Sequence, residues 1–328
     1  MAATRRSTDE LINESTGLYK DNTAGDISAS DLRDGVFSWY QPQGICQGRL
    51  TLESGVAVST SDQTAKTNVY FTPYNGNSVG LFDGTSWKLY TFSEITLALG
   101  TIADASNYDI FLYDNAGTLT LELSAAWTND TTRANALALQ DGVYVKSGAT
   151  TRLHVGMLRT TSTTTTEDSA GGSTSQVGGK RFLWNRFNRV RRRLSVIDGT
   201  DTWTYSTTSY RQANAASGNQ VEIVAGDAID DIRLFVSTWS LNTIGPTACR
   251  IGIGEDSTTA QAAQTFFTGG VFAVNNDYAN PEATLIKSPA IGYHYYAWLE
   301  NGSGSGTNTW YGDNAGTDRF GMTGDWAC

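Results

Sequence analysis

Histidine is scarce in this sequence, since 328 residues include only His154 and His294. A His-rich metal site cannot be built from two histidines about 140 residues apart, and a hydrolytic triad would need one of them. Three cysteines, Cys46, Cys249 and Cys328, lack the CxxC spacing of zinc ribbons and thioredoxin-like motifs. We therefore expect no enzymatic activity, no metal and no cofactor, and we expect both histidines to be packed or hydrogen-bonded strand residues.

Long apolar runs are also missing. No stretch of 18 or more apolar residues occurs, and the N-terminus lacks the apolar middle region of a secretory signal. The net charge of −10 opposes a whole-surface attraction to nucleic acid or to an anionic membrane. We expect a protein made in the cytoplasm that has no membrane partner, and nucleic-acid binding is not expected without a local basic patch.

Turn-forming and aromatic residues are abundant, with 34 Gly, 9 Trp, 15 Tyr and 12 Phe against only 5 Pro. β-Branched and aromatic side chains fit a pleated surface, and Gly supplies turn conformations. Hairpin turns are expected at residues 83–85, 114–118 and 147–149, each between two apolar runs. The sequence predicts a mainly β protein with one or two antiparallel β-sandwich domains of jelly-roll-like type.

Three regions are expected along the chain. Residues 1–40 form a docking segment of short helices, residues 41–179 a first β domain that ends in a Thr/Ser/Gly-rich loop from 160, and residues 180–328 a second β domain. A crossover helix is expected at 130–139. Short helices cannot bury their apolar faces alone, so the N-terminal segment should attach to the body or to a partner. Its expected contact residues are Leu11, Ile12, Leu18, Tyr19, Ile27 and Leu32.

A basic segment at residues 180–193 opens the second domain. It holds seven of the 23 basic residues and no acid. Because the whole chain has a net charge of −10, the rest of the chain carries −17. Three roles are open: a groove for single-stranded nucleic acid, a face that docks on the acidic surface of a neighbouring subunit, or a charged edge strand, intrasubunit or solvated, that resists aggregation. The interface role would use Arg181, Arg186, Arg189, Arg191, Arg192 and Arg193.

The cysteines and two tryptophans are further candidates. Cys328 ends the sequence and is expected to be reachable, so Cys46, Cys249 and Cys328 are candidates for interchain disulfides, the alternative being three reduced thiols. Exposed aromatic rings could instead stack on a glycan, for which Trp298 and Trp310 are the candidates.

Several stretches of the sequence resemble tailed-bacteriophage virion proteins. The run LYKDNTAGDISASDLRD at 18–34 resembles the short leader of fibre and appendage proteins. A β-rich module of phage and prophage virion proteins is similar to the stretches YFTPY (70–74), LFDGTSW (81–87), YDIFLYD (108–114), DGVYVKSG (141–148), KRFLWN (180–185) and GYHYYAWLE (292–300). The resemblance extends from about residue 10 to 300 and carries no catalytic motif.

The resemblance implies a structural virion component, such as a fibre, collar or capsid decoration, on the exterior of a particle assembled in the host cytoplasm. Its partners would be other virion proteins and further copies of itself, with a homotrimer favoured by the fibre analogy. The alternative is a receptor-binding module that engages a host surface glycan. An enzyme that degrades that glycan is a third reading, for which no carboxylate pair is singled out.

Overall fold

The computed structural model describes residues 42–172, 176–314 and 318–328. Within these ranges the elements are strands, apart from one 3₁₀ turn, η1 (Ala213–Ala215), so the prediction of a mainly β protein is confirmed. Within the described ranges, no helix is long and apolar enough to cross a membrane. The helices expected in residues 1–40 lie outside the described ranges, together with Leu11, Ile12, Leu18, Tyr19, Ile27 and Leu32.

The first part of the chain builds three sheets around one core. A three-stranded sheet has the order β1 (Gly48–Thr51), β3 (Asn68–Pro73), β6 (Ile95–Ala98). A hairpin pairs β4 (Ser78–Phe82) with β5 (Trp87–Thr91). A six-stranded sheet has the order β8 (Thr118–Leu123), β7 (Asn107–Asn115), β11 (Ala149–Arg159), β10 (Val143–Lys146), β9 (Leu137–Gln140), with β14 (Leu183–Asn185) also on β11.

Two larger sheets dominate the second part. An eight-stranded sheet has the order β2 (Gln63–Lys66), β12 (Thr166–Gly171), β13 (Gly178–Arg181), β18 (Gln220–Ala225), β26 (Gly292–Asn301), β21 (Thr247–Glu255), β23 (Gly270–Phe272), with β17 (Arg211–Gln212) also on β26. A five-stranded sheet has the order β15 (Arg191–Ile197), β30 (Gly321–Ala327), β19 (Ile232–Ser237), β25 (Glu282–Lys287), β22 (Phe266–Thr268). The two sheets pack on each other and share one core.

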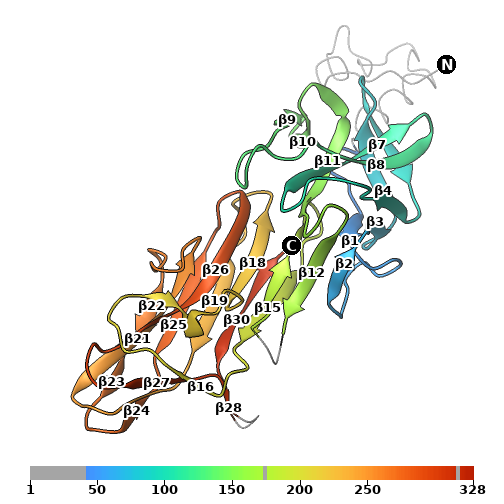
Figure 1. Cartoon of the computed structure of the whole chain (residues 1–328). Helices are drawn as coiled ribbons and strands as arrows, with labels where there is room; N and C mark the ends of the chain where they lie inside the picture. The colour runs from blue at the N-terminus through green and yellow to red at the C-terminus, as the bar shows by residue number, and fades with distance from the viewer. Residues whose placement is uncertain (1–41, 173–175, 315–317) are drawn as a thin grey trace, which may run out of the picture.

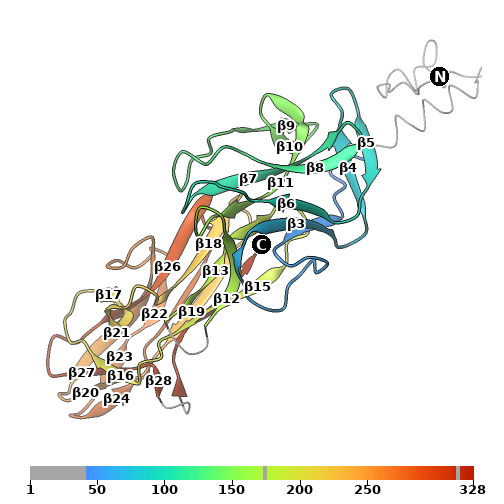
Figure 2. The same cartoon turned by 45° about the vertical axis from the view of Figure 1, so that its right-hand side comes forward.

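Smaller sheets close the end of the molecule that lies farthest from the first part (Figure 1). A four-stranded sheet has the order β16 (Thr202–Thr204), β27 (Asn308–Tyr311), β20 (Ser240–Asn242), β24 (Asp277–Ala279). A two-stranded ribbon pairs β28 (Asp313–Asn314) with β29 (Asp318–Arg319). The whole described chain is elongated, with the first part at one end, and the last residue lies where the two parts meet (Figures 1 and 2).

The two hydrophobic cores meet at β11 and β14. Leu183 belongs to the core of the first part and Trp184 to the core of the second. Leu158 and Met157 divide between the same two cores. Successive side chains of a strand point to opposite faces, so a single strand can feed two cores. The expected domain boundary between Gly179 and Lys180 falls inside β13. β13 is also hydrogen-bonded to β12, so these two strands lie in the same sheet on either side of the expected boundary.

The local predictions have mixed outcomes. The three hairpin turns are confirmed, because β4 and β5, β7 and β8, and β10 and β11 flank them. The helix expected at 130–139 is wrong. Leu137–Gln140 forms β9, which pairs with β10 and leaves Leu139 61% exposed. Cross-strand pairing outweighs the helical spacing of three apolar residues in this segment.

The expectation of an exposed loop throughout 160–179 is also wrong, because Thr166–Gly171 forms β12. Thr166, Asp168 and Ser169 are buried although none is apolar. Their polar groups are satisfied within the protein: Thr166 Oγ1 donates to the Arg159 carbonyl oxygen at 2.6 Å, and Asp168 accepts from Arg181 at 2.9 Å. Because the buried residues of this strand are polar and hydrogen-bonded, a hydrophobicity pattern does not predict it.

Candidate functional site

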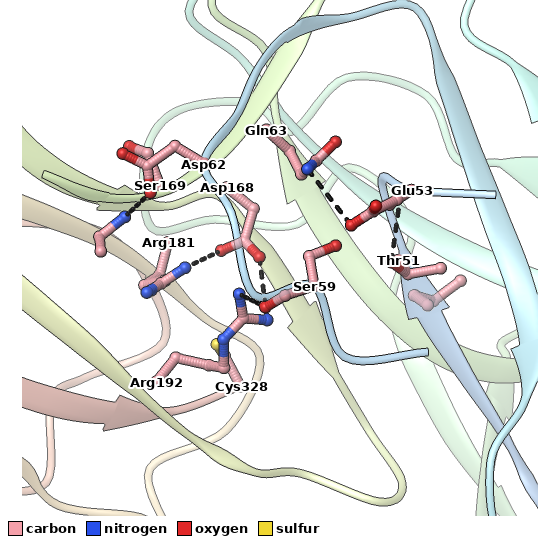
Figure 3. A network of polar contacts seen from close by, with 12 residues as sticks. Thr51, Glu53, Ser59, Asp62, Gln63, Asp168, Ser169, Arg181, Arg192 and Cys328 are labelled. Atoms are coloured by element: carbon pink, nitrogen blue, oxygen red, sulfur yellow. Dashed lines mark hydrogen bonds and ion pairs between the residues drawn. The ribbon is translucent and has the colours of Figure 1, made fainter. Parts of the chain in front are cut away.

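Two arginines from opposite ends of the basic segment contact one buried carboxylate. Arg181 Nη1 lies 2.9 Å from Asp168 Oδ1, and Arg192 Nη1 lies 3.2 Å from Asp168 Oδ2. Figure 3 shows Asp168 between the two guanidinium groups, with Ser59 beside Arg192. The Arg192 guanidinium also donates to the Ser59 carbonyl oxygen at 2.9 Å, and Arg181 donates to the Arg193 carbonyl oxygen at 2.5 Å. This cluster joins β12, β13 and β15 to the chain before β2.

The remaining arginines pair with other acids. Arg186 and Arg189 both contact Asp227, at 3.1 and 2.9 Å. Arg191 forms an ion pair with Asp325 on the neighbouring strand. Of the six predicted interface arginines, only Arg193 lacks a side-chain ion pair within the described residues. The intrachain alternative therefore accounts for five of them, and their role at a subunit interface stays a prediction.

The expectation of a reachable thiol at Cys328 is wrong for this fold. Cys328 is 1% exposed, and its backbone pairs with Val190. Cys249 is fully buried and Cys46 is 9% exposed. Burial raises the pKa of Cys249 to about 11 and of Cys46 to about 12, which keeps both as unreactive thiols at neutral pH. All three are free thiols, and an interchain disulfide would require the local structure to open first.

The assignment of Trp298 and Trp310 to glycan stacking is also wrong. Both side chains are 0% exposed and belong to the core of the second part. Trp298 lies edge-on to Trp203 with ring centroids 5.9 Å apart, and Trp310 Nε1 donates to the Tyr205 carbonyl oxygen at 2.8 Å. Trp298 is on β26, inside the eight-stranded sheet, and Trp310 is on β27, inside the four-stranded sheet. Because both rings are fully buried, no ligand at the surface reaches them.

Exposed apolar side chains instead gather at one edge of the second part. We call Phe266, Phe267 and Val271 the apolar edge, and they are 79%, 46% and 68% exposed. β22 carries the two phenylalanines and ends the five-stranded sheet, while β23 carries Val271 and ends the eight-stranded sheet. Both strands present backbone groups that no further strand of the described chain pairs, and such edges are templates for pairing with another chain.

The sequence contained a signal for this edge that hydrophobicity alone does not give. Adjacent residues of a strand point to opposite faces, so Phe266 and Phe267 cannot both enter one core. Unless a second core lies on the other face, as it does for Leu183 and Trp184, one of the two rings is exposed or covered by a partner. The paired phenylalanines therefore point to a surface of interaction.

A buried polar cluster holds the two parts together near His154, which lies on β11 and is fully buried. His154 Nε2 lies 2.9 Å from Asp109 Oδ1, and Arg186 Nε donates to His154 Nδ1 at 3.3 Å. Because Nδ1 accepts a hydrogen bond, the ring is neutral and donates through Nε2. Burial lowers the pKa of His154, and the charges of Arg186 and Arg133 act in the same direction.

His294 on β26 is nearly buried and has the opposite environment. Its Nδ1 lies 2.7 Å from Asp256 Oδ2, and its Nε2 lies 3.1 Å from the Ala290 carbonyl oxygen. Although burial opposes it, the Asp256 carboxylate raises the pKa of His294. Both histidines are thus hydrogen-bonded strand residues, as the sequence predicted. The described residues contain no group of three or more His, Cys, Asp or Glu side chains that could hold a metal ion.

Glu300 is a buried carboxyl group whose pKa is raised above its ordinary value. Its Oε2 accepts from Trp203 Nε1 at 2.6 Å and its Oε1 from Arg211 Nε at 2.7 Å. Burial raises the pKa of Glu300 to about 7, against these two favourable contacts. Between about pH 4.5 and 7 the folded chain therefore holds a proton that the unfolded chain has lost, so stability falls as pH rises through this window.

We expect Glu300→Gln to flatten this part of the stability–pH profile, which spans on the order of 3 kcal/mol in the wild type. The absolute stability of the variant should be lower, because the amide nitrogen of Gln would meet the Trp203 N–H donor. Urea unfolding at a series of pH values measures the slope. Glu282→Gln, on the surface of β25, is the matched control for loss of one carboxylate. An unchanged slope in Glu300→Gln would assign the profile to other groups.

Comparison with known proteins gives no family. No protein-family model matches the chain, and no curated protein matches it. One solved structure that aligns with it is the crystal structure of a Bacillus thuringiensis Cry1Da tryptic core variant, at 6% identity and a TM-score of 0.18. The alignment covers 80% of this chain and 48% of the other, so the chain spans about half the length of the structure it matches. A TM-score this low supports no inference about fold or function.

Proposed function

We propose that this protein is a non-enzymatic structural component of a tailed-phage particle that assembles by protein–protein contact through its apolar edge. It would sit on the particle exterior as a fibre, collar or decoration protein, and its first partner would be another copy of itself, in a homotrimer. The packed sheets of the second part would be a β-sandwich of jelly-roll-like type. The phage assignment rests on the sequence resemblance, and the assembly role rests on the apolar edge.

The exposure of Phe266 carries the assembly proposal. A phenylalanine that is 79% exposed at the end of a sheet gains free energy when a partner covers it, and exposed apolar patches on soluble proteins mark interaction sites. Natural proteins protect such edges with charged residues or Pro. Phe267 and Val271 occupy these positions instead, so the edge is built for pairing. Three copies close into a ring when this edge of each copy packs on a different surface of the next copy, which is the heterologous contact of a cyclic trimer.

We expect Phe266→Asp to weaken self-association at least about 30-fold, because a carboxylate would be desolvated at the centre of the contact. Sedimentation equilibrium of the purified full chain measures the oligomeric state. Ile229→Asp is the matched control: Ile229 is 69% exposed but lies in the loop after β18, outside the apolar edge. A monomeric wild-type chain, or a Phe266→Asp chain that associates like the wild type, would contradict the proposal.

The phage assignment has a separate test. An antibody against this protein should label density-purified particles released from the host culture, and the Phe266→Asp chain should be depleted from them. Particles that lack the wild-type protein would remove the virion role while leaving the self-association measurement intact.

A second candidate function is receptor binding through a surface glycan. Trp298 and Trp310 cannot serve it, but a different aromatic group is exposed. Trp239 and Tyr278 are 39% and 57% exposed, and Tyr278 contacts Tyr311 with ring centroids 6.0 Å apart. Solvent-exposed aromatic rings with hydroxyl groups are suited to sugar rings, which present both C–H faces and hydroxyls. This observation keeps the glycan function as a candidate.

A further inference from the structure

The outer face of the five-stranded sheet carries two adjoining depressions that the assembly role does not use. The first, with a volume of about 150 Å³, is lined by Arg193, Phe235, Arg319 and Phe320 among others. The second, of about 330 Å³, is lined by Arg233, Phe235 and Thr284 among others. Phe235 belongs to both and is 39% exposed. The two depressions therefore adjoin at Phe235 and Thr323 and extend over β15, β30, β19 and β25, and we call the two together the cleft.

The charge of this cleft is opposite to that of the protein. Arg193 on β15 and Arg233 on β19 both lie directly opposite Asp325 on β30, the strand between them. The Asp325 carboxylate is paired with Arg191, the next outward residue of β15. The arginines that line the depressions, Arg193, Arg233 and Arg319, together with Asp325 give a local charge of +2 in a chain of −10. Cations concentrated in this way attract an anionic ligand.

Arg193 is suited to such a ligand because it is exposed and has no side-chain ion pair within the described residues. Arg319, at the same depression, is 54% exposed, and its nearest acid contact is Asp313 at 3.7 Å. A guanidinium group binds a carboxylate through two parallel hydrogen bonds. Each depression thus offers an arginine for one carboxylate of a ligand.

Aromatic rings extend the cleft beyond the first depression. Phe320, at its end, contacts Trp239 with ring centroids 5.2 Å apart, and Trp239 contacts Tyr278 at 6.4 Å. A row of aromatic rings beside arginines matches a polymer of sugar rings that carry carboxylates. A depression of about 150 Å³ holds a single sugar ring but no strand or helix of a partner protein.

We propose that this cleft binds an acidic oligosaccharide built from uronate units. Phe235 and Phe320 contact the apolar faces of successive sugar rings, and Arg193 and Arg233 bind their carboxylates. The site deepens the second candidate function and rests on it, whereas self-association through the apolar edge is independent of it. Phe266 lies opposite Thr284, which lines the second depression, whereas Val271 of the apolar edge lies on β23 in the other sheet.

Titration calorimetry of the full-length chain with a short oligogalacturonate tests the proposal. We expect binding that weakens as salt is raised and no binding of a neutral malto-oligosaccharide of equal length. Arg193→Gln and Phe320→Ala should each weaken binding about tenfold or more, since each removes a charge-assisted contact or a stacking surface. Arg250→Gln, an exposed arginine on β21 in the other sheet, should bind like the wild type.

Three results would overturn the site: no binding of oligogalacturonate by the wild type, equal binding of the neutral oligosaccharide, or wild-type affinity in Arg193→Gln. Thermal unfolding of each variant verifies that it is folded. Val271→Asp, on β23 in the other sheet, separates this proposal from the assembly function. A monomeric Val271→Asp chain that still binds supports a site complete in one chain, and loss of binding in that variant contradicts it.

Discussion

Replacing Asp109 by alanine is expected to lower the free energy of unfolding by about 3–5 kcal/mol, because it leaves buried hydrogen-bond donors without their acceptor. Asp109 is fully buried on β7. It accepts from Trp127 Nε1 at 3.0 Å, from Arg133 Nε at 3.1 Å, and it partners His154 Nε2 at 2.9 Å. Although burial opposes ionisation, the contacts with His154 and Arg133 hold the pKa of Asp109 below its ordinary value. Without the carboxylate, the Arg133 charge loses its side-chain partner.

Urea unfolding at neutral pH measures this change. Asp104→Ala is the matched control, because Asp104 is exposed and its carboxylate accepts only the backbone N–H of the adjacent Ala105 in the described contacts. It should alter stability by less than about 0.5 kcal/mol. If Asp109→Ala behaved like Asp104→Ala, the cluster around His154 would contribute nothing to the attachment between the two parts.

Trp298→Ala is expected to cost about 3–5 kcal/mol through loss of burial and the cavity left behind. The ring is fully buried on β26, the strand that pairs with β18, β21 and β17. It contacts Trp203 edge-on, so the cavity would also leave that ring without its aromatic neighbour. The cost should appear as a lower midpoint of urea unfolding.

Phe266→Ala provides the comparison for an aromatic residue at the surface. Its side chain is 79% exposed, so truncation in the monomer should change stability by less than about 0.5 kcal/mol. A Trp298→Ala chain with wild-type stability would contradict the core position of the ring. It would also reopen the glycan role that the sequence assigned to this residue.

Much of the β structure follows from the sequence, because hairpin turns combine local turn chemistry with short-range pairing. The turn at Asp83-Gly84-Thr85 is an example: the Asp83 carboxylate accepts two backbone N–H groups of the turn, and β4 and β5 pair across it. Long-range pairing is different. β30 lies between β15 and β19, more than 80 residues earlier in the chain, and no local pattern specifies that placement.

The candidate sites were harder to predict, since composition does not reveal burial. Trp298 and Phe266 are both aromatic residues in strands, yet one is fully buried and the other 79% exposed. What separates them is the position of the strand within its sheet, central for β26 and terminal for β22. The arginines of residues 180–193 were similarly ambiguous. Their acids, such as Asp168 and Asp227, come from distant strands and loops and could be identified only in the fold.

The shared strands β11 and β14 have a mechanical consequence. Leu183 is held in one core and Trp184, its neighbour, in the other, so a pull on either end of the molecule is borne by consecutive residues of one strand. No flexible linker separates the two ends at this point, and a bend between them would have to extract one of the two side chains. The two ends of the described chain are therefore coupled through β11 and β14, whose side chains enter both cores.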